Sequence, residues 1–256
     1  MIGIFDSGSG GLSVLREIVR LLPGESYVYY ADNAYCPYGE KSAEEIQARA
    51  RWITDTLLSE GAEIIVVACN TATAAAIAYL RESYPALRFI GMEPAVKPAA
   101  IGTRSGVIGV LATAGTLQGS KYLNTKGKYQ DNVEILEHVG QGFVELVEAG
   151  DLDSPHAESV VRASVEPLLE AGADTLVLGC THYPFLRPLI ERIAGPKVRV
   201  IDPAPAVARR LVDVMRSEGL LREEAFVKSA PRVKLLSSGD PEALRRIYPL
   251  AIGPDR

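Results

Sequence analysis

Two segments of the chain combine a strand-like apolar run with a cysteine and a polar turn. Residues 64–73 (IIVVACNTAT) contain Cys69, and residues 175–184 (TLVLGCTHYP) contain Cys180. Apolar runs of this length and composition are typical of buried strands. In open α/β sheets, ligands bind beyond the carboxyl ends of the parallel strands. Two such segments in different halves of the chain therefore predict one site that both halves build.

Strand-like and helix-like segments alternate along the whole chain, which indicates an α/β protein with mostly parallel, doubly wound sheets. Both halves follow one order: strand, loop and helix, then a strand, a helix, the strand with its cysteine, and a last strand. We therefore expect an internal duplication, with two domains related by a pseudo-twofold axis and the active site in the cleft between them. We assign residues 1–94 and 208–256 to the first domain and residues 95–207 to the second.

Composition and charge argue against several classes of protein. The 256 residues are 47% hydrophobic and 23% charged, and the net charge is 27 − 32 = −5 without any run of Lys or Arg, so we expect no nucleic-acid partner. No apolar run approaches the about 20 residues that cross a bilayer, so we expect no membrane association. The three cysteines give no disulfide framework and no secretory signal is visible, which together indicate a cytoplasmic protein.

Cys69 and Cys180 are the residues best suited to carry chemistry. Either cysteine alone is a small residue that packs well at a strand end, but their equivalent positions favour a shared function. Side-chain donors follow each of them, and a helix N-terminus beyond each would lower the thiol pKa and bind a carboxylate. Two thiols that face each other across a cleft suit racemisation or epimerisation, because one removes a proton from carbon while the other returns a proton to the opposite face.

The loops after the first strand of each half are further candidates. Asp6 and Ser7 lie in one loop, and Thr113 and Thr116 lie in the other. We expect Asp6 to contact the proton-transfer groups or a substrate ammonium, and Ser7 to donate to a carboxylate. The glycines that follow let the backbone approach a small anion closely. His182, two residues after a candidate thiol, is expected to tune that thiol.

Neither a metal nor an organic cofactor is expected. Residues 180–182 lack the paired ligand spacing of structural zinc sites, and no lysine occupies a strand end as pyridoxal phosphate would require. A dinucleotide site is an alternative, because residues 8–11 form a glycine loop that opens a helix and Asp32 ends the second strand. However, Ser13 stands where that fingerprint has its third glycine, and Asp6 would lie close to a pyrophosphate.

These motifs together resemble those of bacterial glutamate racemases, in the aspartate/glutamate racemase family. The resemblance runs from Ile2 to about Arg210 and rests on four motifs: Asp6-Ser7-Gly8-Ser9-Gly10-Gly11, Pro37-Tyr38-Gly39, Cys69-Asn70-Thr71-Ala72 and Gly179-Cys180-Thr181-His182-Tyr183-Pro184. It implies an isomerase that interconverts L- and D-glutamate without a cofactor, for the synthesis of cell-wall peptidoglycan. It also implies a homodimer, which is common in the family.

The resemblance also implies roles for individual residues. Cys69 would take the α-proton from D-glutamate, with help from Asp6. Cys180 would take it from L-glutamate, with help from His182, and Glu148 matches in position an acidic residue that supports the histidine. The implied substrate contacts are Asp6, Ser7, Pro37, Tyr38, Gly39, Asn70, Thr71, Thr113, Thr116, Thr181 and His182. Cys36 has no counterpart in these motifs and is expected to be incidental.

Three other interpretations stay open at this point. The first is a racemase of the same superfamily that acts on aspartate or another small acid. The second is a nucleotide-binding oxidoreductase, which binding of NAD(P) would reveal. The third is a non-catalytic protein that binds small acids, in which both thiols would be replaceable without loss of ligand binding.

Overall fold

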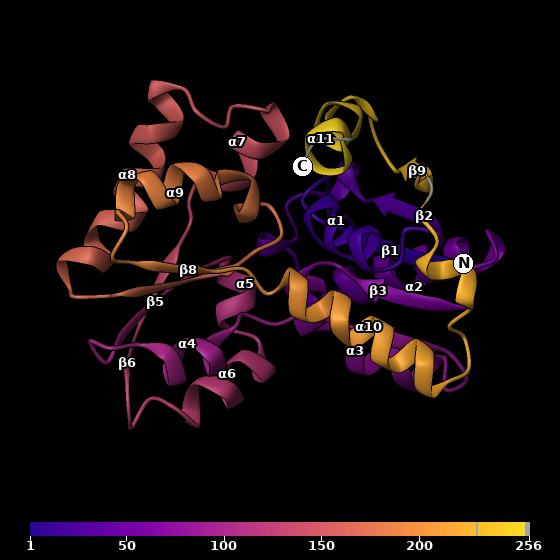
Figure 1. Ribbon diagram of the computed structural model, residues 1–256, viewed down its shortest axis with the longest axis horizontal. Helices are drawn as coiled ribbons and strands as arrows, with labels where there is room; N and C mark the ends of the chain where they lie inside the picture. The colour runs from indigo at the N-terminus through magenta and orange to yellow at the C-terminus, as the bar shows by residue number, and fades with distance from the viewer. Residues whose placement is uncertain (229, 254–256) are drawn as a thin grey trace.

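Two parallel β-sheets form the framework of the computed structural model, which describes residues 1–228 and 230–253. The sheets lie in separate lobes (Figure 1). The first sheet has the order β4-β3-β1-β2-β9, with β1 (Ile2–Asp6), β2 (Ser26–Ala31), β3 (Ile64–Val67), β4 (Arg88–Ile90) and β9 (Arg232–Ser237). The second has the order β6-β5-β7-β8, with β5 (Val107–Ala112), β6 (Glu134–Val139), β7 (Thr175–Gly179) and β8 (Arg199–Ile201).

The two sheets repeat one strand order. Their first four strands in chain order lie as second, first, third and fourth, and the neighbouring strands pair in parallel. This repetition confirms the predicted α/β class and the duplicated, doubly wound arrangement. The C-terminal tail adds β9 to the first sheet, where it pairs in parallel with β2. The predicted boundary between residues 207 and 208 falls inside α10 (Ala204–Ser217), which packs against α1 (Leu12–Leu21), and the domain boundaries themselves stay a prediction.

Helices cover both faces of the sheets. The first lobe carries α1, α2 (Ala43–Ser59), α3 (Asn70–Ser83), α10 and α11 (Glu242–Ile252). The second carries α4 (Val96–Gly102), α5 (Ala114–Leu117), α6 (Ser120–Gly127), α7 (Phe143–Ala149), α8 (Pro155–Glu170) and α9 (Arg187–Ala194). Short 3-10 turns are η1 (Asn33–Tyr35), η2 (Tyr38–Glu40), η3 (Tyr183–Leu186) and η4 (Glu223–Phe226). None of the described helices is both long and apolar enough to cross a membrane.

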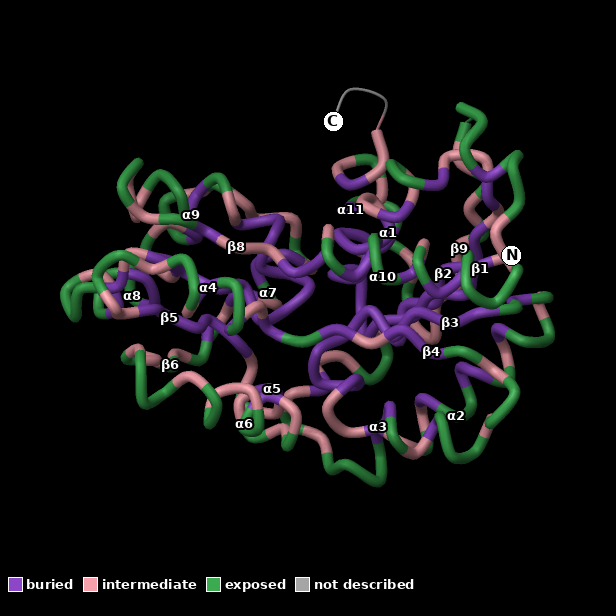
Figure 2. The backbone as a smooth tube through the Cα atoms, turned by 60° about the horizontal axis from the view of Figure 1, so that its bottom comes forward, coloured by how far each residue is buried: buried purple, intermediate pink, exposed green. Residues whose placement is uncertain are grey.

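The central strands are buried on both faces, as Figure 2 shows for β1 and β3. Alternate residues of β1 point into different cores: Ile2 and Ile4 pack with residues of α1, whereas Phe5 packs with residues of α2 and α3. Because both faces are covered, these strands are near-continuous apolar runs rather than alternating ones. This is why the sequence shows strands such as IIVV with no polar position.

Two helical segments of the second lobe are interrupted. After β5 the chain forms α5 and α6 rather than one helix, because Gly119 between them has an extended backbone with ψ 134°. After β7 the chain begins as the 3-10 turn η3, and α9 starts only at Arg187. Pro188 has no N–H to continue an α-helical ladder, so the two segments cannot join as one regular helix. By contrast, α2 has a well-defined start, because Ser42 and Glu45 form both hydrogen bonds of a capping box.

Candidate active site

The candidate residues lie at the carboxyl ends of the central strands. Asp6 ends β1 and Cys69 follows β3, while Thr113 follows β5 and Cys180 follows β7. In each sheet these two strands are neighbours from which the chain continues in opposite directions across the sheet. Such a switch point is where open α/β sheets bind ligands. The fold therefore gives each half one position of this kind, with one thiol at each.

A small cavity joins the two switch points. With the exception of Val144, every residue that lines it is one that the sequence analysis selected: Ser7, Pro37, Tyr38, Gly39, Cys69, Asn70, Thr71, Thr113, Thr116, Cys180, Thr181 and His182. The cavity measures only about 20 Å³. A site of that size holds about one water molecule. The structure therefore shows a closed cleft, too small for an amino acid to fit as it stands.

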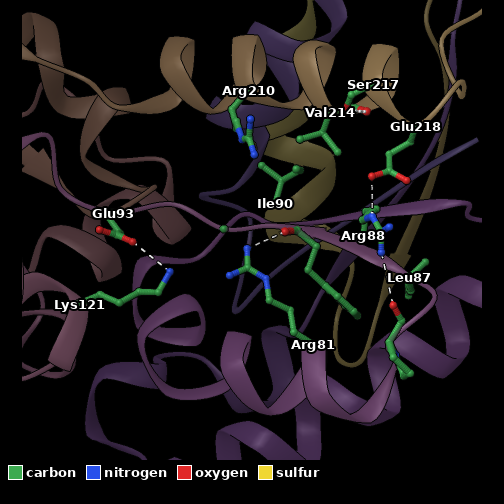
Figure 3. A pocket seen from close by; sticks show the side chains of 13 residues that line it. Arg81, Leu87, Arg88, Ile90, Glu93, Lys121, Arg210, Val214, Ser217 and Glu218 are labelled. Carbon is green, nitrogen blue, oxygen red and sulfur yellow. Dashed lines mark hydrogen bonds and ion pairs between the residues drawn. The ribbon is translucent and has the colours of Figure 1, made fainter.

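A much larger cavity, of about 560 Å³, lies elsewhere between α3, β4 and α10 (Figure 3). None of the predicted site residues lines this larger cavity. Several of its charged groups already pair with each other: Lys121 lies 3.0 Å from Glu93, and Arg88 lies 2.8 Å from Glu218. Chemistry rather than size therefore identifies the small cavity as the candidate active site.

Cys69 is the N-cap residue of α3. The Ala72 N–H donates to its Sγ at 3.4 Å, and the thiol lies 3.8 Å from the Ser7 hydroxyl. Burial and the nearby Asp6 carboxylate raise the pKa of Cys69 well above its ordinary value, although the Ala72 N–H opposes this. The expected lowering by the helix N-terminus is therefore present but outweighed. In the closed structure Cys69 is a protonated thiol.

Asp6 is completely buried and does not itself line the cavity. Its Oδ2 accepts a 2.8 Å hydrogen bond from the Gly11 N–H, and the Thr181 hydroxyl lies 3.4 Å from each carboxylate oxygen. Burial raises the pKa of Asp6 to about 6, even though the charge of His182 acts in the opposite direction. A carboxyl group with this pKa exchanges protons readily near neutral pH.

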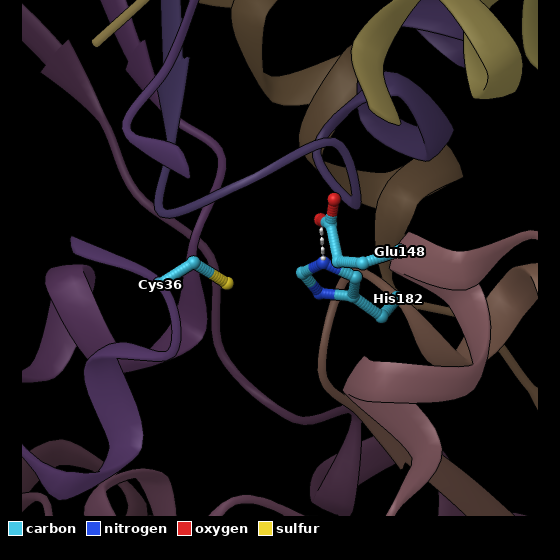
Figure 4. Close-up of side chains that lie close together, drawn as sticks. All are labelled: Cys36, Glu148 and His182. Carbon is cyan, nitrogen blue, oxygen red and sulfur yellow. Dashed lines mark hydrogen bonds and ion pairs between the residues drawn. The ribbon is translucent and has the colours of Figure 1, made fainter. Parts of the chain in front are cut away.

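Cys180 belongs to a relay with His182 and Glu148. Its Sγ lies 3.7 Å from His182 Nδ1, and His182 Nε2 lies 2.7 Å from Glu148 Oε1. Figure 4 shows the imidazole and the carboxylate in contact. Burial alone would lower the pKa of His182, but its bonds to Cys180 and Glu148 raise it well above its ordinary value. Burial likewise opposes ionisation of Glu148, yet the bonds from His182 and Ser9 lower its pKa, so the pair is an imidazolium with a carboxylate.

The glycine loop makes room for this pair. A Cβ on Gly8 would lie 2.4 Å from Glu148 Oε1, and a Cβ on Gly10 would lie 2.4 Å from His182 Nδ1. Between them, Ser9 donates to Glu148 Oε1 from its N–H at 2.7 Å and from its hydroxyl at 2.9 Å. The glycines thus let the first half approach the His182–Glu148 pair of the second half. The sequence pattern predicts that this loop binds a small anion, and no local motif reveals that Ser9 donates to Glu148 instead.

Polar side chains on the cavity wall include one with unused bonding capacity. Among the described residues, the Asn70 amide is buried with neither its nitrogen nor its oxygen hydrogen-bonded. Buried polar groups are normally bonded, so this amide is suited to a polar ligand. Thr71 of the first half lies 2.8 Å from Thr113 and 3.3 Å from Thr116 of the second, measured between hydroxyl oxygens. These three hydroxyls close the cavity on that side.

Asp32, the residue that supported the dinucleotide alternative, is fully buried and already engaged. Arg49 donates to its two oxygens at 2.7 and 3.0 Å, and the Tyr38 hydroxyl donates at 2.5 Å. The carboxylate therefore holds the Tyr38–Gly39 segment against the cavity and is not available to a ribose. Arg49 carries no motif that would have identified this function from the sequence.

Comparisons with known proteins agree with this site. The sequence pattern of the family described as Asp/Glu/Hydantoin racemase matches residues 2–211. The glutamate racemase of Ectopseudomonas mendocina (strain ymp) is 50% identical over 252 residues, which cover 98% of this chain and 94% of that protein. The structure of the Francisella tularensis glutamate racemase in complex with D-glutamate has a TM-score of 0.81 and 29% identity, covering 98% of this chain and 92% of that one.

A second solved structure matches equally well. Escherichia coli glutamate racemase, in complex with L-glutamate and the activator UDP-MurNAc-Ala, has a TM-score of 0.84 and 32% identity, covering 97% of this chain and 92% of that one. The matches extend over both halves, including the C-terminal tail that carries no motif. This chain belongs to the Asp/Glu/hydantoin racemase family and, within it, to the bacterial glutamate racemases that its motifs resemble.

Proposed function

We propose that this protein interconverts L- and D-glutamate without a cofactor, with Cys69 and Cys180 as its two acid/base groups. The observation that carries the proposal is the closed cavity, which the two thiols line from opposite halves of the chain. Each thiol has its own ionisable partner, Asp6 for one and His182 for the other. The L- and D-glutamate complexes of related proteins support glutamate as the substrate.

The charges around the two thiols suit opposite proton transfers. The imidazolium of His182 stabilises negative charge on Cys180, so this sulfur can act as the base toward L-glutamate. Cys69 stays protonated beside Asp6 and donates its proton to the other face of the α-carbon. The net result is D-glutamate, with a proton now on Cys180 and none on Cys69. The reverse reaction starts from that state.

Removal of an α-proton from an amino acid requires stabilisation of the negative charge that develops. Ser7, Asn70, Thr71 and Thr181 place hydroxyl and amide groups on the cavity wall, and the N-terminus of α3 adds backbone N–H groups that favour a carboxylate. A closed cavity of about 20 Å³ leaves no room for bulk water around the reacting atoms. The protein itself thus supplies the electrostatic stabilisation.

The resemblance to bacterial glutamate racemases supports three further parts of the proposal. D-glutamate made here serves the synthesis of cell-wall peptidoglycan, the enzyme acts in the cytoplasm, and it forms a homodimer. Sedimentation of the purified protein tests the dimer. A strain depleted of the gene product tests the role in the cell wall, because added D-glutamate should restore its growth.

The proposed activity is tested by incubating the metal-free protein with L-glutamate in D2O. Deuterium should enter the α-carbon while optical rotation is lost, and L-aspartate in parallel tests specificity. Cys69→Ser and Cys180→Ser should each nearly abolish racemisation while the circular dichroism spectrum stays unchanged, since serine is nearly isosteric with cysteine. Wild-type turnover in either variant would show that the two-thiol mechanism is wrong. Exchange with aspartate alone would move the substrate assignment to the aspartate racemases.

A further inference from the structure

Cys36 lies close to the Glu148–His182 pair, although it belongs to none of the motifs described above. One ligand atom from each of these three side chains lies within 4.8 Å of the other two (Figure 4). Cys36 follows η1 in the first half of the chain, whereas Glu148 lies in α7 and His182 precedes η3 in the second half. The cluster therefore spans the cleft between the halves.

Thiolate, imidazole and carboxylate are the ligands that Zn²⁺ takes, and three protein ligands leave a fourth position for water. With zinc–ligand bonds of about 2.0–2.3 Å, the ligand atoms of a tetrahedral site lie about 3.3–3.6 Å apart. Because the three ligand atoms already lie within 4.8 Å of one another, changes of about 1.5 Å or less in their separations give this geometry. The Glu148 Oε2 atom accepts a long hydrogen bond of 3.3 Å, from Asn33, and so has bonding capacity for an ion.

A cavity gives two members of this cluster access from solvent. It measures about 390 Å³ and is lined by Cys36 and Glu148, whereas His182 is buried behind them and, like Cys69 and Cys180, does not line it. Glu145 and Asp240 add negative charge to its wall, while Glu242 pairs with Arg245 at 2.8 Å and Arg246 adds one positive charge. An acidic cavity raises the local concentration of cations. A cation can thus reach Cys36 and Glu148 without passing Cys69 or Cys180, and His182 Nε2 lies next to this point, 2.7 Å from Glu148 Oε1.

We propose that Cys36, Glu148 and His182 bind Zn²⁺ or another soft divalent cation, and that the bound ion inhibits the enzyme. The ion occupies His182 Nε2 in place of the proton shared with Glu148, and Cys36 releases its thiol proton on binding, as zinc ligands do. His182 then no longer exchanges protons through Glu148 beside Cys180. The metal bonds also fasten the first half to the second, so the cleft cannot open for substrate.

No sequence motif predicts this site, because its ligands are at positions 36, 148 and 182 and lack the short spacing of structural zinc motifs. Hard cations such as Mg²⁺ prefer oxygen ligands and should not bind here. The proposal therefore concerns an inhibitory ion, and it leaves the metal-free racemisation mechanism unchanged.

The test compares the chelator-treated wild-type protein with Cys36→Ser, which should keep the metal-free activity because Cys36 lies outside the catalytic cavity. Added ZnCl2 should inhibit the wild type, and MgCl2 should not. The Zn²⁺ concentration that gives half-maximal inhibition should be at least about tenfold higher for Cys36→Ser than for the wild type, as expected when a metal site loses a contributing group. Glu145→Gln is the matched control: it changes the same cavity without removing a ligand and should stay close to the wild type.

Co²⁺ binding supplies a readout that is independent of activity. The wild type should show a thiolate-to-cobalt charge-transfer absorption, and Cys36→Ser should lack it. The inhibition experiment rests on the proposed racemase function, whereas the cobalt spectrum does not, so the failure of one is distinguishable from the failure of the other. Equal zinc inhibition of both proteins, or a thiolate–cobalt band that persists in Cys36→Ser, would place the ion on Cys69 or Cys180 and overturn the proposal.

Discussion

Replacement of Glu148 by glutamine tests the relay at Cys180 most directly. The glutamate accepts three short hydrogen bonds on Oε1: from the Ser9 N–H at 2.7 Å, from the Ser9 hydroxyl at 2.9 Å and from His182 Nε2 at 2.7 Å. Glutamine has the same shape, and its carbonyl oxygen can still accept all three. What Glu148→Gln removes is the negative charge that keeps the imidazole protonated.

The size of the effect follows from the change in the hydrogen bond to His182. A hydrogen bond to a charged group contributes about 1.5–3 kcal/mol and a neutral one about 0.5–1.5 kcal/mol. The expected loss is therefore about 1–1.5 kcal/mol. If this stabilisation acts in the transition state at Cys180, kcat/KM falls about five- to thirteenfold, since 1.36 kcal/mol corresponds to a factor of ten. Thermodynamics requires the same fall in both directions, because the two enantiomers are equally stable.

Isotope effects reveal which thiol has become slow. Proton removal by Cys180 limits the variant more than it limits the wild type. The primary isotope effect should therefore rise for L-glutamate deuterated at the α-carbon and fall for the D-enantiomer, whose proton goes to Cys69. Asp6→Asn, beside the other thiol, serves as the matched control and should shift the two isotope effects in the opposite sense. Parallel shifts for both enantiomers in Glu148→Gln would refute the assignment of this relay to one thiol.

Further predictions concern stability and packing. The pKa of Asp6 is raised from 3.8 to about 6, so the folded state binds this proton more tightly than the unfolded state does. The resulting stabilisation is present at low pH and is lost as the pH rises through about 6. The free energy of unfolding of Asp6→Asn, measured with urea, should therefore increase by about 3 kcal/mol relative to that of the wild type between pH 4 and pH 7. Gly10→Ala should lower kcat/KM about 100-fold by displacing the catalytic imidazole, whereas Gly127→Ala, with open space around its Cβ position, should not. Arg49→Met should lower the free energy of unfolding by about 3–5 kcal/mol, because it leaves Asp32 charged and buried, and Asp32→Asn in the same chain should recover part of this loss.

Much of the fold was predictable because local patterns and the global arrangement agree. Apolar runs that end in turn formers mark the parallel strands, and the capping box at Ser42 marks the start of α2. The hydrophobic pattern does not predict where a helix begins when a proline or an extended glycine lies near its start. Pro188 delays α9, and the extended Gly119 divides α5 from α6. In both places the backbone of one residue, rather than the hydrophobic period, decides where the helix begins.

The cavity wall was predictable from motifs, but its supports were not. Cys69 and Cys180 stand at strand ends that a duplicated α/β fold must bring to one cleft. The bonds from Ser9 to Glu148 and from Arg49 to Asp32 join residues 139 and 17 positions apart, which local spacing cannot reveal. The direction of the pKa shift of Cys69 was not predictable either. The helix N-terminus alone predicts a lowered pKa, but burial and the Asp6 carboxylate raise it.

The duplication supplies two similar thiols, and their partners make them unequal. Cys180 faces a cation, the imidazolium of His182, whereas Cys69 faces an anion, Asp6. Both partners depend on the opposite half of the chain: Ser9 holds Glu148 behind the imidazolium, and the Thr181 hydroxyl points at Asp6. These bonds cross from one half of the chain to the other, so both partners are held in place by the contact between the halves. The closed cleft therefore places a protonated thiol, Cys69, and a thiol beside a cation, Cys180, around one small cavity that holds no bulk water.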